Sequence, residues 1–561
     1  MSEDLIDHYL PCTERLINLV NSDDELLLIQ AVQCINESLQ SCDVQFIYDH
    51  IIPAIVKCAS LDSLHVAQYL LTCLPDFGEN LFEYFQEVAE AILINQIMPV
   101  VHGIVLCRSP QLKEIISECW AALITILDPQ DFLENEIPLL KKFSSSQKKE
   151  VKIVVLTVLS SLTDFFDPNI WYDSLYEMIN QFTKDSASAV RSLVPPIIAQ
   201  YSKKLTDPRQ LAQLSGRFAI LCRDSYTPVR KAAAESIVTL SESLDHASRL
   251  VTILPSVELL LQDPSELVRS IISMYLGPLI SSIGPSVNSN LVHQFSMKLI
   301  SKDITVAYPA AFSFPAVALT LGRERFDEIK SSFETASKSK EFRIRRTLSF
   351  GIHSFGHIIP PEDISSVVDR FLRDISSVSI GIVSNLNLIA QLIDNKKDLL
   401  FCLQEPLKKY TEWRMRLKVS EQLRYCSDMF ESKELIDSAK DLLRDPVSVV
   451  RRDAVLSFVH LMDNNDMEFL IELAKSDKYA DREIAAMIFE YADISKVKSV
   501  FDVLIWLTKD KVVNVRINAA SAVGSIAASD ENIKEFNQII NNLLQDTDAD
   551  VKSAILYHLN S

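Results

Sequence analysis

The sequence contains very little glycine, with ten glycines in 561 residues. Soluble proteins ordinarily contain about 7% glycine. The glycine motifs of nucleotide and hydrolase sites, G-x-G-x-x-G, G-x-x-x-x-G-K-[ST] and G-x-S-x-G, are all absent from the sequence. This scarcity argues against dinucleotide and phosphate-loop enzymes. It also argues against the string of three to five linked domains that the length alone would suggest.

The sequence also lacks an excess of basic residues. It has 55 Lys and Arg against 75 Asp and Glu, a formal net charge of −20. A net anion of this size is poorly suited to phosphate backbones, so nucleic acid is not expected as the main partner.

No signal for export or membrane insertion stands out. The first residues, MSEDLIDHYL, are acidic where a secretory signal has a basic stretch and an apolar run, which predicts residence in the cytoplasm or the nucleus. The longest uncharged apolar segment, Ala91 to Cys107, contains Asn95, Gln96, Pro99 and His102. It predicts a buried helix pair and no membrane span.

Metal-binding and catalytic patterns are missing as well. The ten cysteines form no C-x-x-C pair and no Cys/His cluster with zinc spacing, so they are interpreted as small buried hydrophobes and no metal or cofactor is expected. His65, His102 and His558 lie in apolar-periodic stretches and are expected in the core. With no converging acid, base or nucleophile, the sequence predicts a protein that is not an enzyme.

What the sequence does contain is a repeat. An aspartate is followed six residues later by the arginine of a Val-Arg pair, or by its equivalent, and then by small aliphatic residues at helical spacing. The clearest copies are Asp185 with Arg191, Asp224 with Arg230, Asp263 with Arg269, Asp445 with Arg451, Asp510 with Arg516, and Asp546 with Lys552. Weaker copies lie at Asp24, Asp62, Ser109, Gln147, Asp303, Lys340 with Arg346, Asp374, Tyr410 with Arg416, and Asp477. Together they divide the chain into about 15 units of about 37 residues.

A unit of this length, with two apolar-periodic stretches around one turn, predicts a helical hairpin. Stacked hairpins make an all-α superhelix, an α-solenoid. The aspartate is expected to cap the second helix, and Pro264 and Pro446 suit its first position. The recurring arginine is expected to form a structural ladder by pairing with the aspartate of an adjacent unit, with a partner contact as the alternative. Trp120, Trp171 and Trp506 are expected in the core.

The signature resembles HEAT repeats, and the C-terminal third is similar to one family built from 15 of them. The similar segments are Glu412–Leu417 (EWRMRL), Asp510–Asn518 (DKVVNVRIN), Leu544–Lys552 (LQDTDADVK) and, more weakly, Ile382–Leu386 (IVSNL). They resemble turns in the scaffold subunit (A, or 65-kDa regulatory subunit) of the type 2A serine/threonine protein phosphatase. Residues 1–180 match only as generic helical hairpins. The turn at Ser265–Arg269 lacks the tryptophan of the family's seventh unit.

The resemblance implies a non-catalytic scaffold with two halves. Residues 1–370 would form repeats 1–9 and receive regulatory (B-type) subunits. Residues 371–561 would form repeats 10–15 and hold the phosphatase catalytic subunit. The positions that correspond to its partner-binding turns are Trp413, Arg414, Val447, Ser448, Tyr479, Arg482, Val512 and Val513. For Trp413, packing between repeats is the alternative to display at an interface.

Two further possibilities remain open at this point. The chain could be a HEAT adaptor of another kind, either a transport receptor of the importin-β type or another phosphatase regulator, such as one of phosphatase 4. Two basic clusters, Lys338, Lys340, Arg343, Arg345 and Arg346, and Lys408, Lys409, Arg414, Arg416 and Lys418, could be solvated turn faces or patches that meet an acidic partner.

Overall fold

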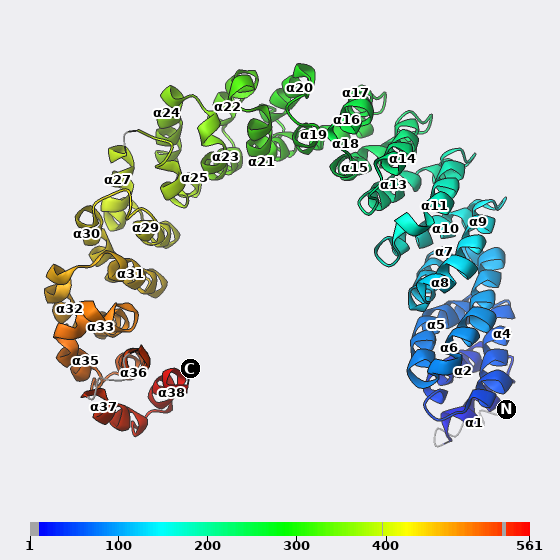
Figure 1. Cartoon of the computed structure of the whole chain (residues 1–561), viewed down its shortest axis with the longest axis horizontal. Helices are drawn as coiled ribbons and strands as arrows, with labels where there is room; N and C mark the ends of the chain where they lie inside the picture. The colour runs from blue at the N-terminus through cyan, green and yellow to red at the C-terminus, as the bar shows by residue number, and fades with distance from the viewer. Residues whose placement is uncertain (1–9, 395, 530–534, 561) are drawn as a thin grey trace. The chain divides into compact units, whose positions relative to one another are not determined.

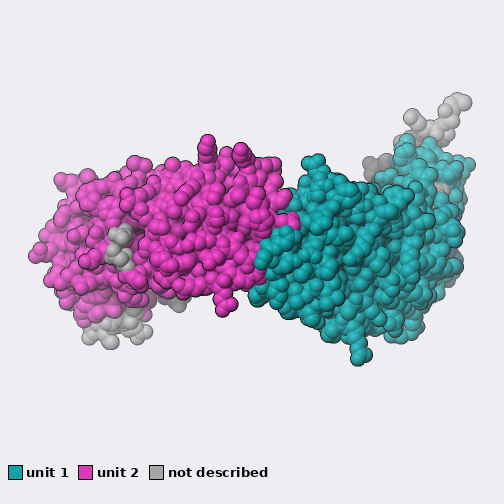
Figure 2. All heavy atoms as spheres, turned by 90° about the horizontal axis from the view of Figure 1, so that it is seen from above, with its two compact units in different colours: residues 1–291 teal, residues 292–561 magenta. Residues whose placement is uncertain are grey.

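The computed structural model describes residues 10–394, 396–529 and 535–560. Within these ranges the regular secondary structure is helical, without strands, and successive antiparallel helices form an α-solenoid (Figure 1). The prediction of an all-α solenoid is therefore confirmed. The chain divides into two compact units, residues 1–291 and 292–561 (Figure 2). The functional boundary predicted at residue 370 falls inside the second unit.

In the first unit, one helix layer consists of α1 (Cys12–Val20), α4 (Ile52–Ser60), α9 (Ile137–Ser144), α11 (Pro168–Thr183), α14 (Pro208–Leu221) and α17 (Leu254–Leu261). The other layer consists of α2 (Glu25–Ser38), α5 (Leu64–Tyr84), the later part of α7 (Met98–Ile126), α10 (Lys149–Ser161), α13 (Val194–Ser202), α15 (Thr227–Ser243), α18 (Glu266–Met274) and α19 (Leu276–Ile283). The first part of α7 folds back and lies beside α4 in the first layer. Short helices α3 (Val44–Phe46), α6 (Gln86–Ile92), α8 (Pro129–Asp131), α12 (Ser188–Arg191) and α16 (His246–Ser248) join them.

In the second unit, the first layer contains α20 (Ser289–Leu299), α22 (Asp327–Ala336), α24 (Pro361–Leu372), α27 (Lys397–Gln404), α30 (Ser432–Leu443), α32 (Met467–Ala474), α35 (Phe501–Leu507) and α37 (Glu535–Leu544). The second layer contains α21 (Ile304–Leu321), α23 (Phe342–Phe355), α25 (Ser376–Val383), α29 (Trp413–Tyr425), α31 (Ser448–Leu461), α33 (Tyr479–Tyr491), α36 (Val513–Ser529) and α38 (Ala549–Asn560). Short helices α26 (Leu386–Ile389), α28 (Pro406–Lys409) and α34 (Ile494–Val497) complete it.

The core lies between neighbouring hairpins, as the sequence periodicity predicts. Val229, Ala233 and Ile237 follow one another at four-residue spacing along α15, and all three are fully buried. Second-layer helices pack on one another along the chain, for example α29 on α31 and α33 on α36. Each hairpin therefore depends on its neighbours to cover its apolar faces.

The turn inside each clear repeat is closed by its aspartate. Asp445 Oδ1 accepts a hydrogen bond from the N–H of Val447 at 2.8 Å, and Asp510 Oδ1 accepts one from Val512 at 2.8 Å. The bonded residue precedes the helix, because α31 begins at Ser448. The prediction that these aspartates cap the second helix directly is therefore wrong, although Asp303 does cap α21.

Pro264 and Pro446 also lie inside the turns and not at the first helical position, since α18 and α31 begin two residues later.

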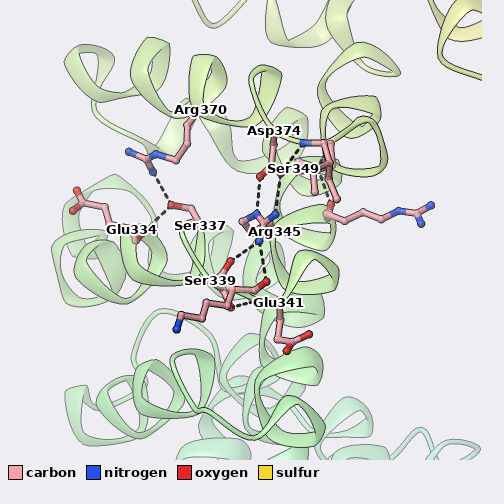
Figure 3. A network of polar contacts seen from close by, with 12 residues as sticks. Glu334, Ser337, Ser339, Glu341, Arg345, Ser349, Arg370 and Asp374 are labelled. Atoms are coloured by element: carbon pink, nitrogen blue, oxygen red, sulfur yellow. Dashed lines mark hydrogen bonds and ion pairs between the residues drawn. The ribbon is translucent and has the colours of Figure 1, made fainter. Parts of the chain in front are cut away.

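The second carboxylate oxygen receives an arginine from the preceding repeat. Arg416 Nε lies 2.5 Å from Asp445 Oδ2, and Arg416 Nη2 lies 3.0 Å from Asp445 Oδ1. The same guanidinium donates through Nη1 to the carbonyl of Tyr410 in its own turn. These two-pronged pairs recur in both units: Arg191 with Asp224, Arg230 with Asp263, Arg345 with Asp374 (Figure 3), Arg416 with Asp445, Arg482 with Asp510, and Arg516 with Asp546.

We call this series the arginine ladder. Lys152 takes the arginine's place opposite Asp185, at 2.5 Å. Arg269 and Arg451 donate to carbonyls of their own turns and have no carboxylate partner among the described residues. For Lys552, in the last described helix, no side-chain partner lies within the described part of the chain.

Three sequence-based expectations are corrected. In the ninth repeat the ladder residue is Arg345 and not Arg346. The reversal expected near Ser109 does occur within α7, because the rings of His102 and Trp120, 18 residues apart, have centroids 5.2 Å from each other. Trp506 is 51% exposed, whereas Trp120 and Trp171 are buried as expected. His65, expected in the core, is exposed, with its Nδ1 3.7 Å from Glu25 Oε2. His102 is buried as expected, beside Glu136.

Glycine is needed at few places in this fold. Gly284 and Gly322, at the ends of α19 and α21, have φ of 88° and 68°, a region that glycine reaches without strain. Other second-layer helices, such as α15 and α31, end on a residue in extended conformation instead. This geometry accounts for the long helical array with so little glycine.

We expect the buried ladder pairs to be essential for local stability. Arg416→Met should destabilise the chain by about 3 kcal/mol because Asp445, itself buried, would lose its cationic partner. Arg451→Met is the matched control, since Arg451 holds the same position without a carboxylate partner among the described residues, and it should cost about 1 kcal/mol. Urea unfolding followed by circular dichroism measures both, and equal losses would contradict the expectation.

Acid should weaken the same pairs. The hydrogen bonds from Arg345 lower the pKa of Asp374, and those from Arg516 lower the pKa of Asp546. Because the folded-state pKa is below the unfolded value of about 3.9, this stability is complete above that value and is lost as pH falls further. The thermal midpoint should therefore change little between pH 7 and 5 and drop below about pH 4. A thermal midpoint at pH 3 equal to the midpoint at pH 7 would contradict an electrostatic contribution of the ladder.

Candidate partner-binding surface

The first residue of each second-layer helix that carries a ladder position occupies an equivalent place in its repeat. It lies three residues before the ladder position, as Trp413 lies before Arg416 and Tyr479 before Arg482. The preceding residues share one extended conformation, with φ and ψ of −80° and 126° at Glu412, and −78° and 122° at Lys478. The Nη1 atoms of Arg416 and Arg482 donate to carbonyls of their own turns, so the first helical side chains of α29 and α33 are presented in the same way.

Trp413 and Arg414 stand at the start of α29. Arg414 is exposed, and its guanidinium lies 4.6 Å from the centroid of the Trp413 ring. Such a cation–π contact orders both side chains at the surface. Trp413 itself is half-buried. One part of the indole is therefore covered by the protein, and the other part is open to solvent beside the Arg414 guanidinium.

The other predicted turn residues differ in exposure. Tyr479 at the start of α33 is 52% exposed, and Ser448 at the start of α31 is exposed. Val447, Val512 and Val513 are half-buried. These residues and the Trp413–Arg414 pair form what we call the C-terminal turn surface.

Arg482 does not belong to this surface. Its side chain is 5% exposed, and it binds the carbonyls of Ser476 and Asp477 and the carboxylate of Asp510. All three guanidinium nitrogens of Arg482 therefore donate hydrogen bonds within the chain, Nε and Nη2 to Asp510 and Nη1 to the two carbonyls. The sequence-based assignment of Arg482 to partner binding is corrected accordingly.

Phe342 is a turn residue that the sequence reasoning missed. It begins α23, three residues before Arg345, and is therefore the equivalent of Trp413. The segment Phe342–Arg345 (FRIR) also repeats the pattern of Trp413–Arg416 (WRMR). Alignment on Arg345 instead of Arg346 would have revealed it.

The two basic clusters behave differently. In the second cluster Arg416 is a ladder residue, Lys408 pairs with Glu405, Lys418 pairs with Glu421, and Lys409 lies over the rings of Phe401 and Tyr410. Arg414 and Lys409 have no carboxylate partner there among the described residues, and of the two only Arg414 is exposed. In the first cluster Arg345 is the one member with a carboxylate partner among the described residues.

Elsewhere, the polar groups that come together are structural. Glu136, buried in the first unit, accepts a hydrogen bond from Trp120 Nε1 at 2.7 Å and lies 3.2 Å from His102 Nε2. No group of three or more His, Cys, Asp or Glu residues suited to a metal ion occurs in the described part of the chain.

Two helical segments, Gln86–Cys107 and Ile304–Leu321, are long and apolar enough for a membrane span by length and composition. Both are packed in the solenoid against neighbouring helices, such as α5 and α23. Core helices of ordinary folded proteins meet the same two criteria, so these segments are weak evidence for a span.

Comparison with known proteins finds phosphatase regulators. No protein-family model matches the chain. Human serine/threonine-protein phosphatase 4 regulatory subunit 1 is 32% identical over 161 residues, which cover 27% of this chain and 17% of that protein. Human serine/threonine-protein phosphatase 4 regulatory subunit 4 is 22% identical over 328 residues, which cover 53% of this chain and 36% of that protein. The chain therefore matches little more than a third, at most, of these relatives' lengths.

Solved structures agree on the fold. A Kap95:Nup1 complex aligns with a TM-score of 0.60 at 13% identity, covering 98% of this chain and 76% of the other. Importin beta aligns with a TM-score of 0.56 at 12% identity, covering 97% and 77%. The chain is thus a HEAT-type α-solenoid with homologues among phosphatase regulatory subunits, which are not catalytic.

Proposed function

We propose that the chain is a non-catalytic scaffold that binds a phosphatase catalytic subunit, either of phosphatase 4 or of type 2A, on the C-terminal turn surface. The observation that carries the proposal is the Trp413–Arg414 pair, displayed at the start of α29 and held in place by the buried pair of Arg416 and Asp445. Tryptophan, tyrosine and arginine are the most frequent anchors of protein interfaces.

Two lines of support differ in the catalytic subunit that they favour. The relatives are regulatory subunits of phosphatase 4. The turn motifs at Glu412–Leu417 and Asp510–Asn518 instead resemble the scaffold subunit of type 2A. The proposal includes both enzymes, and measuring the affinity of the chain for each catalytic subunit tells which of the two it prefers.

The scaffold would act through geometry. The ladder keeps successive turns in one conformation, so Trp413, Tyr479 and Val513 would engage one partner at several points without ordering flexible loops first. A regulatory (B-type) subunit bound on turns of residues 1–370 would then be tethered to the same chain as the catalytic subunit, which raises their effective concentration for each other. We propose that this assembly resides in the cytoplasm or the nucleus, the two compartments that the acidic N-terminal residues favour.

The decisive test is capture of the catalytic subunit by full-length variants. Trp413→Ala combined with Arg414→Glu should weaken binding of purified phosphatase 4 or type 2A catalytic subunit by about 30-fold or more, the scale of an interface hot spot. Biolayer interferometry measures the affinity. Trp506→Ala is the matched control, because Trp506 is an exposed tryptophan that lies on α35 in the other layer. Equal binding by the double variant and the wild type would contradict the proposal.

A second test addresses the two halves. Tyr226, exposed in the turn before α15, lies with its ring 5.3 Å from the Arg191 guanidinium in the first unit. Tyr226→Ala should leave capture of the catalytic subunit unchanged and reduce recruitment of a regulatory (B-type) subunit to the preformed complex severalfold, as measured by quantitative co-purification. Loss of the catalytic subunit instead would contradict the division of labour.

A further inference from the structure

The first basic cluster carries a surface that the proposed function does not use. Residues 338–346 contain five basic residues and one acidic residue in a chain of net charge −20. Lys338, Lys340, Arg343 and Arg346 are exposed and have no carboxylate partner among the described residues, whereas Arg345 between them is bound to Asp374 (Figure 3). Four cations at one turn are therefore free to meet an external anion.

Exposed aromatic side chains lie beside these cations. Tyr308 and Phe312, four residues apart on α21, are 43% and 73% exposed. Phe342 at the start of α23 is 39% exposed. Helices α21 and α23 are neighbours in the second layer (Figure 1). Phe312 buries only a small part of its surface within the chain, and clustered exposed rings mark interaction sites.

The two helices enclose a groove of about 820 Å³ lined by Tyr308, Phe312, Phe342, Arg343, Arg346 and Phe350. A smaller hollow of about 430 Å³ adjoins it and shares Tyr308 and Arg343. The helices meet closely behind the groove, because a Cβ on Gly351 would stand 2.6 Å from Pro315 Cγ. The floor of the groove is therefore packed helix, and its opening faces solvent.

The arginines are placed for recognition of an anion at the edge of this groove. The guanidinium of Arg346 lies 5.5 Å from the Phe350 ring centroid, which orients it over the aromatic wall. Arg343 follows Phe342 directly, in the arrangement of Arg414 after Trp413. Guanidinium groups bind carboxylates through two parallel hydrogen bonds.

We infer that the groove between α21 and α23, here called the aromatic–arginine groove, binds a short peptide segment of a partner protein that carries a bulky apolar side chain flanked by Asp or Glu. The apolar side chain enters between Phe312 and Phe342, and the carboxylates meet Arg343 and Arg346. A protein of net charge −20 repels a long polyanion but tolerates a few carboxylates at a local basic turn, which favours an acidic peptide over nucleic acid.

This inference is independent of the catalytic-subunit proposal. The groove is built from α21 and α23, whereas the C-terminal turn surface begins at α29. A chain that fails to bind any phosphatase would still have the groove, and the tests use different variants.

The first experiment selects peptides without assuming their sequence. A phage-displayed library of random 12-residue peptides is panned against the full-length chain and, in parallel, against the full-length variant Arg343→Glu/Arg346→Glu. The expected result is enrichment, on the wild type alone, of peptides with a bulky apolar residue near two or more acidic residues. No enrichment, or enriched peptides without acidic residues, would overturn the inference.

The second experiment measures affinity for the most enriched peptide, made synthetically with a fluorescent label. Phe312→Ser and Arg343→Glu/Arg346→Glu should each weaken binding at least tenfold, whereas Arg209→Glu/Arg223→Glu, with the same charge change at exposed arginines of the first unit, should change it less than twofold. Circular dichroism of all variants checks the fold. Equal weakening by both charge reversals would show a non-specific charge effect and overturn the inference.

A labelled ten-residue oligothymidine is the final probe. It should not bind the wild type at concentrations that saturate with the peptide. If it binds at least as tightly as the peptide, and Phe312→Ser weakens it, the groove is a single-strand nucleic-acid site and the inference of an acidic peptide is wrong.

Discussion

The two-pronged bond between an arginine of one repeat and the aspartate of the next is the interaction on which the other features of this protein depend. Each aspartate closes its own turn with one oxygen and receives the preceding repeat's arginine largely with the other, as Asp445 does with Val447 and Arg416. One residue therefore fixes both the local turn and the spacing between repeats. Since no hairpin can bury its apolar faces alone, the pairs also determine which faces meet.

The ladder also explains why the surface features are regular. In the turns before α23, α29 and α33 the ladder arginine donates through Nη1 to a carbonyl of its own turn. Phe342, Trp413 and Tyr479 are therefore equivalent positions even though they lie far apart in the chain. Function in this molecule then depends on which side chain occupies that place. The fold supplies a repeated frame, and substitution at one position in each frame creates different binding surfaces along it.

Sequence reasoning found the frame but assigned some residues to the wrong role in it. The repeat of Asp and Arg predicted the solenoid and most turns, because apolar periodicity and turn chemistry are local properties. The family resemblance assigned Arg482 to a partner-binding surface, and the apolar periodicity assigned Trp506 to the core; Arg482 is buried and Trp506 is exposed. Burial on a helix depends on which neighbour covers each face. A one-residue difference in register, as between Arg345 and Arg346, changes that face by about 100°.

The sequence by itself determined the fold class, the period of the repeat, the scarcity of glycine and the identity of most turns, since each depends on residues close together in the chain. Tertiary structure decided which cations are neutralised. Arg345 and Arg416 pair with Asp374 and Asp445 of the following repeats, while Arg343 and Arg346 lie beside Phe312 and Tyr308, which come from another repeat, and have no carboxylate partner among the described residues. The physical reason is that a salt bridge or a groove joins residues about 30 or more positions apart, and only the packing of helices brings them together.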